Sequence, residues 1–514
     1  MRRTPVAVGV ALGVAFGELT GAEPAGAQQR PAAAPTARTD SARALPFAEF
    51  RRQVLAAHPV ARQAALARAQ AREELRVARG AFDPSLTATV DRKTFAGTLY
   101  YSYAQAELKI PTPVGSDVKL GYERALGRYI AGDRRTGDPL NSAANPGLFK
   151  LGLSVPVGQR LVTDERRTAL AQARALQTAA EADRSAALNK LLLDAAKTYA
   201  RWYEGDRRRG VAREGVALAE FRLRAVRARV ARGEAPAIDT VEALLEVQRR
   251  QVQRYEAEQV YYGAALEAAN FLWGPGQTPS DARPLELAPG TVPTVRGLEA
   301  ERVDSARLPQ WLELAAERHP EVRKAAARVD QAAAQRLFVM QQAIPFAELS
   351  LNSVGAQSAF GARPPAGAQY GFDRENLLVG GTVRTPLLFM KERGRSNIAH
   401  QRLDQQRLEQ ARVRRAVELE VRQSVFDLST TYAVLDLQRL AVRQARQLLA
   451  GESRRFEAGE SQLLTVNLRE RLVLEEELKL ASLEAKYVAA RAALAVALGE
   501  PVVLPASGTP EGGS

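Results

Sequence analysis

Two stretches of helical sequence, each about 70 residues long, most constrain what this chain can fold into. They span 162–232 and 391–458, and the first contains no proline. Helices of this length exceed the usual globular range, so they predict a coiled-coil-like assembly. One face of the first stretch carries apolar residues at alternating steps of four and three, the period of a helix: Leu188, Leu192, Ala195, Tyr199 and Trp202.

A glycine ends each long stretch, and a second helical pattern follows it. Gly233 precedes a helix predicted over 238–273, and Gly459 precedes one predicted over 461–498. The turns read RGEAPAID and AGESQLLT, so the same interrupted helix pair occurs twice. The last helix has an apolar residue at every seventh position, which is typical of a coiled-coil seam: Val466, Val473, Leu480, Tyr487 and Leu494.

Residues of alternating polarity precede each long helix and predict strands within 83–157 and 346–386. The first region is the longer one, and its segment 98–125 has strand-like arms around a Pro/Gly turn. A few strands per chain cannot close a barrel, because closure needs about eight or more. The pattern therefore predicts an oligomer that pools strands and helices from several copies.

The whole order of elements is duplicated, which predicts two structural repeats over 45–273 and 310–498. Each repeat begins with a short helix and then a helix that starts at a His-Pro pair, His58-Pro59 in the first and His319-Pro320 in the second. A Pro/Gly-rich linker over 274–309 joins the repeats.

The N-terminus predicts a secretory signal peptide over 1–27. A basic pair precedes an uncharged stretch that is too short to span a bilayer, and a small-x-small cleavage site ends at Ala27. The segments 28–44 and 499–514 are rich in small residues and proline or glycine, so we expect them to be flexible. No later stretch has 18 consecutive apolar residues, so residence in a membrane would require a β-barrel.

Composition excludes several classes of function. The chain has no cysteine, which excludes disulfides, thiolate metal sites and cysteine nucleophiles, and it has 3 histidines. The net charge of +14 could indicate nucleic acid binding, but the arginines alternate with glutamates in a way typical of solvated helix faces. Phosphate-loop, dinucleotide and paired-histidine motifs are absent. We expect no enzyme activity, no cofactor, no metal and no nucleic acid partner.

In this order, the residues resemble the TolC family of outer-membrane efflux channels over about 45–501. The family enters each long helix from a strand that ends in proline, and LSVPVGQRLVTDERR at Pro156 and VRTPLLFMKERGR at Pro386 look like those entries. It also turns at a glycine that is followed six residues later by aspartate. Gly233 and Asp239 fit that pattern, whereas the second turn has Thr465 at the corresponding position.

The resemblance implies a mainly α fold with a β-barrel portion. Three protomers would pool four strands each into a twelve-stranded barrel in the outer membrane, and their helices would form a hollow α-barrel across the periplasm. It also implies a passive duct that works with a periplasmic adaptor and an inner-membrane pump. The extra hairpin at 98–125 departs from this pattern, and it could join the barrel, plug it or fold over its rim.

The resemblance places a pore gate at the two glycine turns. Asp239 is the first candidate for lining or latching the pore, and Glu242 and Glu460 are weaker ones. Alternatively, Asp239 and Glu242 complement the dipole of the helix that begins there. Phe456 stands where the family has a tyrosine able to hydrogen-bond the first-turn aspartate, so a looser and more apolar closure is predicted.

Three other functions compete with an efflux channel. The same architecture could serve as the outlet of a type I protein-secretion system. A secreted coiled-coil scaffold or adhesin would explain the signal peptide and the helices, but not the strands at matching places in both repeats. A cytosolic coiled coil that binds nucleic acid would explain only the charge.

Overall fold

The computed structural model describes residues 43–126, 148–274, 287, 291–294, 304–355 and 377–502. The chain divides into Met1–Ser41 and Ala42–Ser514, and every element below belongs to the second unit. The predicted signal peptide lies outside the described residues, as do most of the flexible segments at the two ends and much of the linker.

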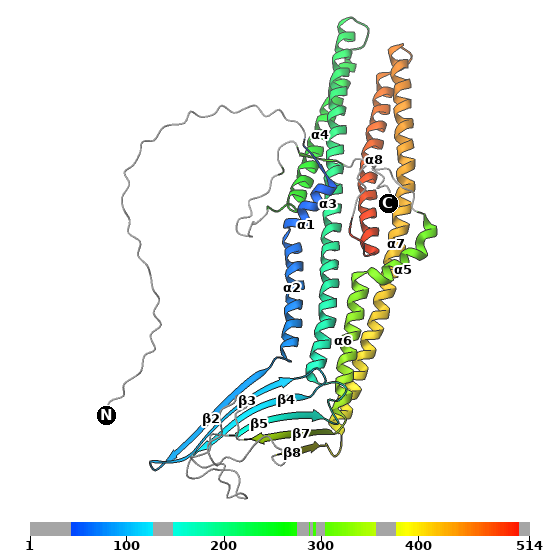
Figure 1. Ribbon diagram of the computed structural model, residues 1–514. Helices are drawn as coiled ribbons and strands as arrows, with labels where there is room; N and C mark the ends of the chain where they lie inside the picture. Colours follow the sequence, from blue (N-terminus) through cyan, green and yellow to red (C-terminus); the bar gives the residue numbers. More distant parts are fainter. Residues whose placement is uncertain are drawn as a thin grey trace, which may run out of the picture. The chain divides into compact units, whose positions relative to one another are not determined.

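Both repeats follow the same order of elements (Figure 1). The first repeat contains α1 (Phe47–Ala57), α2 (Pro59–Gly80), β2 (Ser85–Phe95), β3 (Thr98–Pro111), β4 (Asp117–Leu126), β5 (Leu148–Pro156), α3 (Glu165–Ala231) and α4 (Ile238–Ala269). The second contains η3 (Ser305–Arg307), α5 (Leu308–Arg318), α6 (Pro320–Gln342), β7 (Phe346–Gly355), β8 (Leu377–Arg384), α7 (Met390–Glu457) and α8 (Leu463–Ala497). None of these helices is both long and apolar enough to cross a membrane.

The two long helices connect two levels of the protomer. Near the strands, α2, α3, α6 and α7 pack side by side in that order. Toward the glycine turns, α4 packs on α3, α3 on α8, and α8 on α7. Each level therefore contains four helices, and only α3 and α7 belong to both.

Histidine caps explain why α2 and α6 begin at equivalent places. His58 and His319 have extended backbones, and the Nδ1 atom of each accepts a hydrogen bond from the backbone N–H two residues later, at 3.2 Å and 3.3 Å. The proline at the first helical position has no N–H to satisfy and already has a helical φ. The same His-Pro cap therefore starts a helix in both repeats.

The strands form one antiparallel sheet of 6 strands in the order β2-β3-β4-β5-β7-β8. β3 and β4 are the extra hairpin predicted around 98–125, and the structure places them inside the sheet, between β2 and β5. The pairing of β5 with β7 joins the two repeats. The first repeat thus supplies four strands and the second supplies two, whereas the resemblance implied four strands in all.

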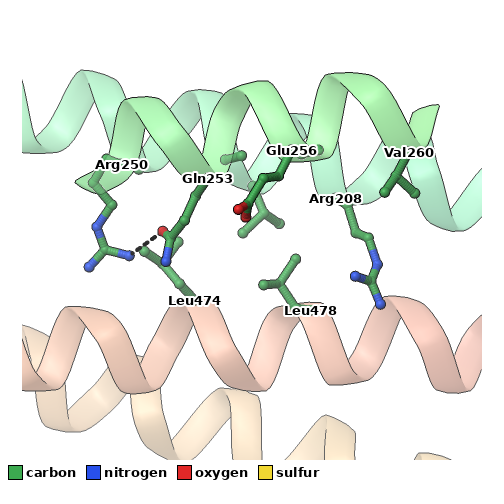
Figure 2. A pocket seen from close by; sticks show the side chains of 11 residues that line it. Arg208, Arg250, Gln253, Glu256, Val260, Leu474 and Leu478 are labelled. Carbon is green, nitrogen blue, oxygen red and sulfur yellow. Dashed lines mark hydrogen bonds between the residues drawn. The ribbon is translucent and has the colours of Figure 1, made fainter. Parts of the chain in front are cut away.

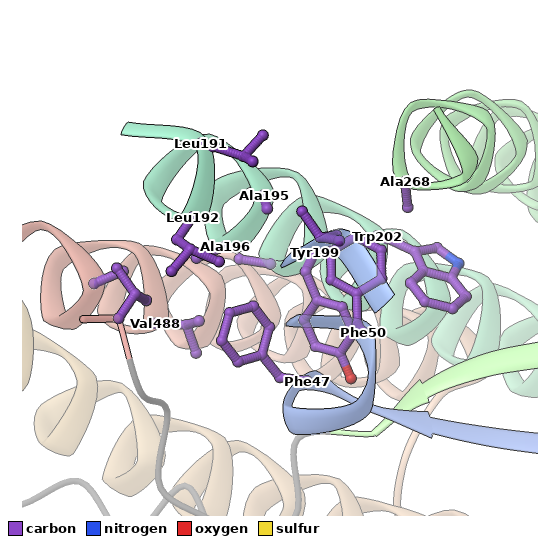
Figure 3. Packing of buried hydrophobic residues seen from close by; sticks show 14 of the residues in the cluster. Phe47, Phe50, Leu191, Leu192, Ala195, Ala196, Tyr199, Trp202, Ala268 and Val488 are labelled. Carbon is purple, nitrogen blue, oxygen red and sulfur yellow. The ribbon is translucent and has the colours of Figure 1, made fainter. Parts of the chain in front are cut away.

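A core of aromatic and small residues holds the start of the first repeat against its long helix (Figure 3). Phe47 and Phe50 of α1 pack on Tyr199 of α3, with ring centroids 5.3 Å and 5.4 Å apart. The Tyr199 ring meets Trp202 edge to face at 5.7 Å. The predicted apolar face of α3 is therefore buried, apart from Leu188, which is half-buried.

Tyr199 also forms hydrogen bonds with both strands of a small parallel sheet that was not predicted from the sequence. Strands β1 (Arg43–Pro46) and β6 (Thr291–Thr294) pair with each other, although β6 lies in the expected linker. The Tyr199 hydroxyl donates a hydrogen bond to the Leu45 carbonyl at 2.7 Å and accepts one from the Thr294 N–H at 3.0 Å. One side chain of the long helix thus holds segments from both ends of the first repeat.

A second core joins α7, α8 and the α5–α6 corner. Val421, Val425, Leu428 and Leu435 are buried on one face of α7. Of the predicted heptad on α8, only Leu480 is not fully buried. The coiled-coil pattern thus corresponds to a continuous packing face.

Candidate functional site at the helical tips

The long helices of both repeats end in the same hydrogen-bonded turn, at the end of α3 and α7 opposite the strands (Figure 1). Gly233 has φ of 72° and Gly459 has φ of 80°, a region that side chains disfavour. The Gly233 N–H donates to the Val230 carbonyl at 2.9 Å, and the Gly459 N–H donates to the Phe456 carbonyl at 3.1 Å. Both turns match a glycine-ended helix cap, which explains the duplicated sequence break.

The acidic candidates lie at the surface of these turns. Asp239 is in the first turn of α4 and is half-buried, while Glu242 and Glu460 are exposed. No side chain caps the N-terminus of α4, and the Asp239 carboxylate lies in its first turn. This position also fits the alternative that Asp239 complements the helix dipole. Thr465 is half-buried in the first turn of α8.

Phe456 is part of an apolar cluster between the two tips. It packs against a core made by side chains of α3, α4 and α8, which includes Leu223, Val247 and Leu463. The guanidinium of Arg229 lies 5.4 Å from the centre of the Phe456 ring. An aromatic face and a cation attract each other, so α3 and α7 meet at the tip through this contact.

A buried ion pair crosses between the two helical hairpins slightly further from the turns. Arg222 of α3 donates to both carboxylate oxygens of Glu470 on α8, and also to the Asn467 side-chain oxygen at 2.9 Å. The Arg222 and Glu470 side chains are 15% and 7% exposed. Two parallel N–H···O bonds hold a carboxylate in a defined orientation, so this contact fixes α3 relative to α8.

A second buried carboxylate links α4 to α8. Glu246 accepts from Arg250 one turn along α4 at 2.7 Å, and Arg471 of α8 lies 3.5 Å from its other oxygen. Glu246 and Arg250 are both buried. A charge this far from water needs partners, which the arginines provide.

A groove runs between the α3–α4 hairpin and α8 (Figure 2). Its cavity of about 310 Å³ is lined by the charged or polar Arg208, Gln253 and Glu256 on one side and by Leu474 and Leu478 on the other. Gly215 in its wall allows close packing, since an added Cβ would lie 3.4 Å from Leu474. The groove combines an apolar floor with charged walls.

Comparisons with known proteins agree with this architecture. Residues 311–500 match the family model described as outer membrane efflux protein. This part of the chain is therefore similar to the outer membrane efflux protein family. Its fold is similar to three solved channels, each over 88% of this chain. These are VceC of Vibrio cholerae (TM-score 0.58, 16% identity, 96% of that chain), MtrE of Neisseria gonorrhoeae in its open state (0.59, 16%, 89%) and CmeC of Campylobacter jejuni (0.57, 12%, 85%). No curated protein sequence matches the chain at a significant level.

The predicted resemblance to TolC-like channels, and with it the fold class, is confirmed. This efflux protein is an outer-membrane channel and is not an enzyme. TolC-like channels are typically trimeric. The scaffold and nucleic-acid alternatives do not agree with the family. No comparison tests the gate residues, so their role stays a prediction.

The prolines at the strand-to-helix junctions lie where each repeat leaves the sheet. Pro156 is the last residue of β5 and is buried, and Pro386 follows β8 and is half-buried. After Pro386, Leu387 and Leu388 are 91% and 75% exposed before α7 begins. Among the described residues of the efflux protein, no three His, Asp or Glu side chains come together as a metal site.

Sequence reasoning missed the buried charges of the tips. The sequence pattern does not distinguish Arg222, Glu246, Arg250, Asn467 and Glu470 from the other polar residues of the helices. A signal exists for Glu246, because it lies three residues after Ala243 and next to Val247, on the buried face of α4. Periodicity can reveal a charge on an apolar face, but it cannot identify a partner more than 200 residues away.

Proposed function

We propose that this efflux channel is a homotrimeric, passive duct that is gated at its helical tips and coupled to a periplasmic adaptor and an inner-membrane pump. The observation that carries the proposal concerns the two sides of the protomer. On each side, the outermost helices and the outermost strand have a surface that lacks a partner within the described chain. A second and third copy would cover them.

At both helical levels, α7 is the outermost helix on one side of the protomer. On the other side, the outermost helix is α2 near the strands and α4 toward the glycine turns. Large apolar side chains are exposed on both edges. Exposed apolar stripes of this length are characteristic of interaction surfaces. On α7 they include Leu408, Leu419, Phe426, Leu437 and Leu448; on α4 they include Val241, Leu245, Val252, Tyr255, Tyr262 and Leu266; on α2 they are Leu66 and Val77.

The spacing on α4 fits a coiled-coil partner. Six of its exposed apolar residues, from Val241 to Leu266, follow one another at steps of four, seven, three, seven and four, which is the spacing of a heptad seam. The buried face of α4 packs on α3, so this second seam is available to another helix. In a ring of three copies, α7 of one protomer would pack on α4 and α2 of the next.

The sheet is also open at both ends. Among the strands that the structure describes, β2 pairs with β3 alone and β8 with β7 alone, so the outer edge of each has no partner there. Unpaired edges are a liability unless they are covered. Pairing of β8 with β2 of the neighbouring copy would satisfy both edges and close the sheet into a ring.

The tips are the proposed gate. Symmetry would turn one Asp239 carboxylate into a ring of three, which attracts cations and repels anions. Glu242 and Glu460, which are exposed at the same turns, would add to that field. The Phe456 cluster would hold the hairpins together by apolar contact, with Thr465 in place of a second acidic ring.

The groove between α4 and α8 is the proposed docking surface of the adaptor. Its apolar floor at Leu474 and Leu478 and its charged rims suit a helical partner, which presents an apolar stripe flanked by polar residues (Figure 2). Arg208 and Glu256 would then set the register of that helix through charge.

Ion selectivity of single channels in planar bilayers tests the gate. Asp239→Asn is expected to shift the reversal potential under a salt gradient toward lower cation selectivity, because the ring loses its charge. Glu49→Gln on α1, far from the tips along the chain, is the matched control and is expected to keep the wild-type value. Equal reversal potentials for wild type and Asp239→Asn would show that Asp239 does not line the pore.

A further inference from the structure

The extra hairpin continues the sheet, with a register shift between Lys93 and Thr94 of β2. Residues of β3 pair with β2 on one side and with β4 on the other, and β4 pairs with β5 over seven residue pairs. The two strands have 14 and 10 residues. A tilted strand needs about 9–11 residues to cross a bilayer, so both are long enough.

One face of the sheet is mainly apolar, although Ser353 of β7 and Arg124 of β4 also lie on it. Directly opposed residues in an antiparallel sheet lie on the same face, so the register defines rows that run from β2 to β8. One such row consists of Leu86, Leu108, Leu120, Leu151, Ser353 and Leu377. The next row of that face consists of Ile110, Val118, Leu153, Leu351 and Val379.

The apolar rows are partly exposed in the protomer. Leu86 is 72% exposed, and Leu120 and Leu151 are 44% and 48% exposed, whereas Leu108, Ile110 and Val118 are half-buried. The mainly apolar face therefore extends from the hairpin to β5 and β7. An apolar exterior of this kind is what a sheet in a bilayer presents to lipid.

The opposite face is mainly polar, also within the hairpin. A row on that face contains Ser85, Lys109, Lys119, Gly152 and Asn352, and it ends at Leu378 of β8. Its side chains interact between strands: Lys150 of β5 lies 2.6 Å from Glu123 of β4, and Ser154 donates to Glu348 of β7 at 2.8 Å. The hairpin thus has the same apolar and polar sides as the other strands.

The turn between β3 and β4 is fixed to the start of α3. Arg166 donates two hydrogen bonds to one oxygen of Asp117, both at 3.0 Å, and Lys109 lies 3.0 Å from the other oxygen. Arg167 donates to the Arg160 and Leu161 carbonyls, and its guanidinium would lie 2.8 Å from a Cβ added at Gly115. The hairpin is therefore anchored at the same level as the strand-to-helix junctions.

We propose that β3 and β4 cross the outer membrane with the other strands, so that each protomer contributes six strands and the trimer closes an eighteen-stranded barrel. The proposal rests on the trimeric channel proposed above. It differs from the twelve strands implied by the family resemblance because the β3–β4 hairpin is inserted between the strands that leave α2 and enter α3.

The larger barrel matches the helices beneath it. Eighteen strands about 4.8 Å apart and tilted by about 40° have a circumference of about 110 Å. Three copies of the four helices at each level make twelve helices, and at about 9–10 Å spacing these occupy about 108–120 Å. Twelve strands at the same tilt would span only about 75 Å. With six strands per protomer, the barrel thus has about the same circumference as the ring of helices, and its strands need no extra tilt.

Quenching by nitroxide-labelled lipid tests the position of the hairpin. The chain has no cysteine, so single cysteines can be introduced and labelled with an environment-sensitive fluorophore in the full-length protein in liposomes. Leu120→Cys reports the apolar face of β4, Lys119→Cys reports its polar face, and Leu151→Cys on β5 is the reference. Leu108→Cys on β3 repeats the test if Leu120→Cys does not assemble.

The proposal predicts that the label at position 120 is quenched as strongly as the label at 151, while the label at 119 is at least severalfold less quenched. Quenching at 151 but not at 120 or 108 would overturn the hairpin assignment and leave the channel intact. No quenching at any of these positions would show that the sheet does not lie in the bilayer, and it would overturn both proposals. Electron cryomicroscopy of the trimer in lipid nanodiscs gives the count directly: eighteen strands support the proposal, and twelve contradict it.

Discussion

Arg222 of α3 and Glu470 of α8 form a two-point ion pair in which both side chains are largely buried. The two residues belong to different repeats, so this contact ties the α3–α4 hairpin to the α7–α8 hairpin near the proposed gate. Opening the tip by separating these hairpins would have to break it. The pair is therefore a candidate for setting how readily the channel opens.

Removal of one partner should loosen the tip strongly. Arg222→Leu leaves the Glu470 carboxylate buried without its partner, which costs about 3–5 kcal/mol. We expect faster hydrogen exchange in α4 and α8 and a larger open fraction in single-channel records. Arg222→Leu/Glu470→Leu should recover most of the loss, because two apolar groups can replace a buried pair.

Arg201→Ala is the matched control for that pair. Arg201 bonds Glu267 between α3 and α4 at 3.0 Å, and the two side chains are 59% and 53% exposed, so its loss should cost about 0–1 kcal/mol. Equal effects of the Arg222 and Arg201 substitutions would show that burial of the first pair has no special role.

The Phe456 ring should set the conductance of the resting channel. Phe456→Tyr introduces a hydroxyl that could bond the Asp239 carboxylate, as the family resemblance suggests, and we expect a lower single-channel conductance. The double variant Phe456→Tyr/Asp239→Asn should regain part of it, because the charged acceptor is gone. Unchanged conductance in Phe456→Tyr would argue against a gate at this position.

Tyr199 should stabilise the first repeat through its hydroxyl. Burial raises the pKa of Tyr199, so it stays a neutral donor at physiological pH. Tyr199→Phe removes the bonds to Leu45 and Thr294 and should cost about 1–2 kcal/mol, measured as a lower thermal unfolding midpoint. Ser185→Ala removes a hydroxyl of α3 that donates within its own helix, to the Glu181 carbonyl at 3.0 Å, and it should leave the midpoint almost unchanged.

The histidine caps should make stability fall in mild acid. Burial lowers the pKa of His319, although the nearby Glu420 and Glu321 oppose the shift, and burial also lowers the pKa of His58. The unfolded chain therefore binds more protons, and stability should decrease as pH falls below about 6.5, the ordinary histidine pKa. The protonated Nδ1 also could no longer accept the capping bond.

Thermal unfolding at pH 7.5 and pH 5.5 measures this effect. His58→Asn/His319→Asn keeps a capping acceptor without a titrating group, so its midpoint should differ less between the two pH values than that of the wild type. An equal difference in both proteins would assign the acid sensitivity to other groups.

The duplicated order and the placement of the long helices could be predicted from sequence, because glycine caps such as Gly233 and Gly459 and the step of three and four are local signals. The place of the extra hairpin could not, since pairing of Leu120 with Leu151 depends on which strands become neighbours. The ion pair of Arg222 with Glu470 could not be predicted either, because periodicity identifies the buried face of a helix but not the residue that packs against it. Strand β6 escaped prediction because it has only four residues within a Pro/Gly-rich segment.

The most direct test of the account is the mass of the full-length protein extracted by detergent from the outer-membrane fraction, determined by light scattering with the detergent contribution removed. The account predicts a particle of three chains, because the open edges of the helical and strand levels need two further copies to close a ring. A single chain, or a protein released in soluble form without detergent, would contradict it.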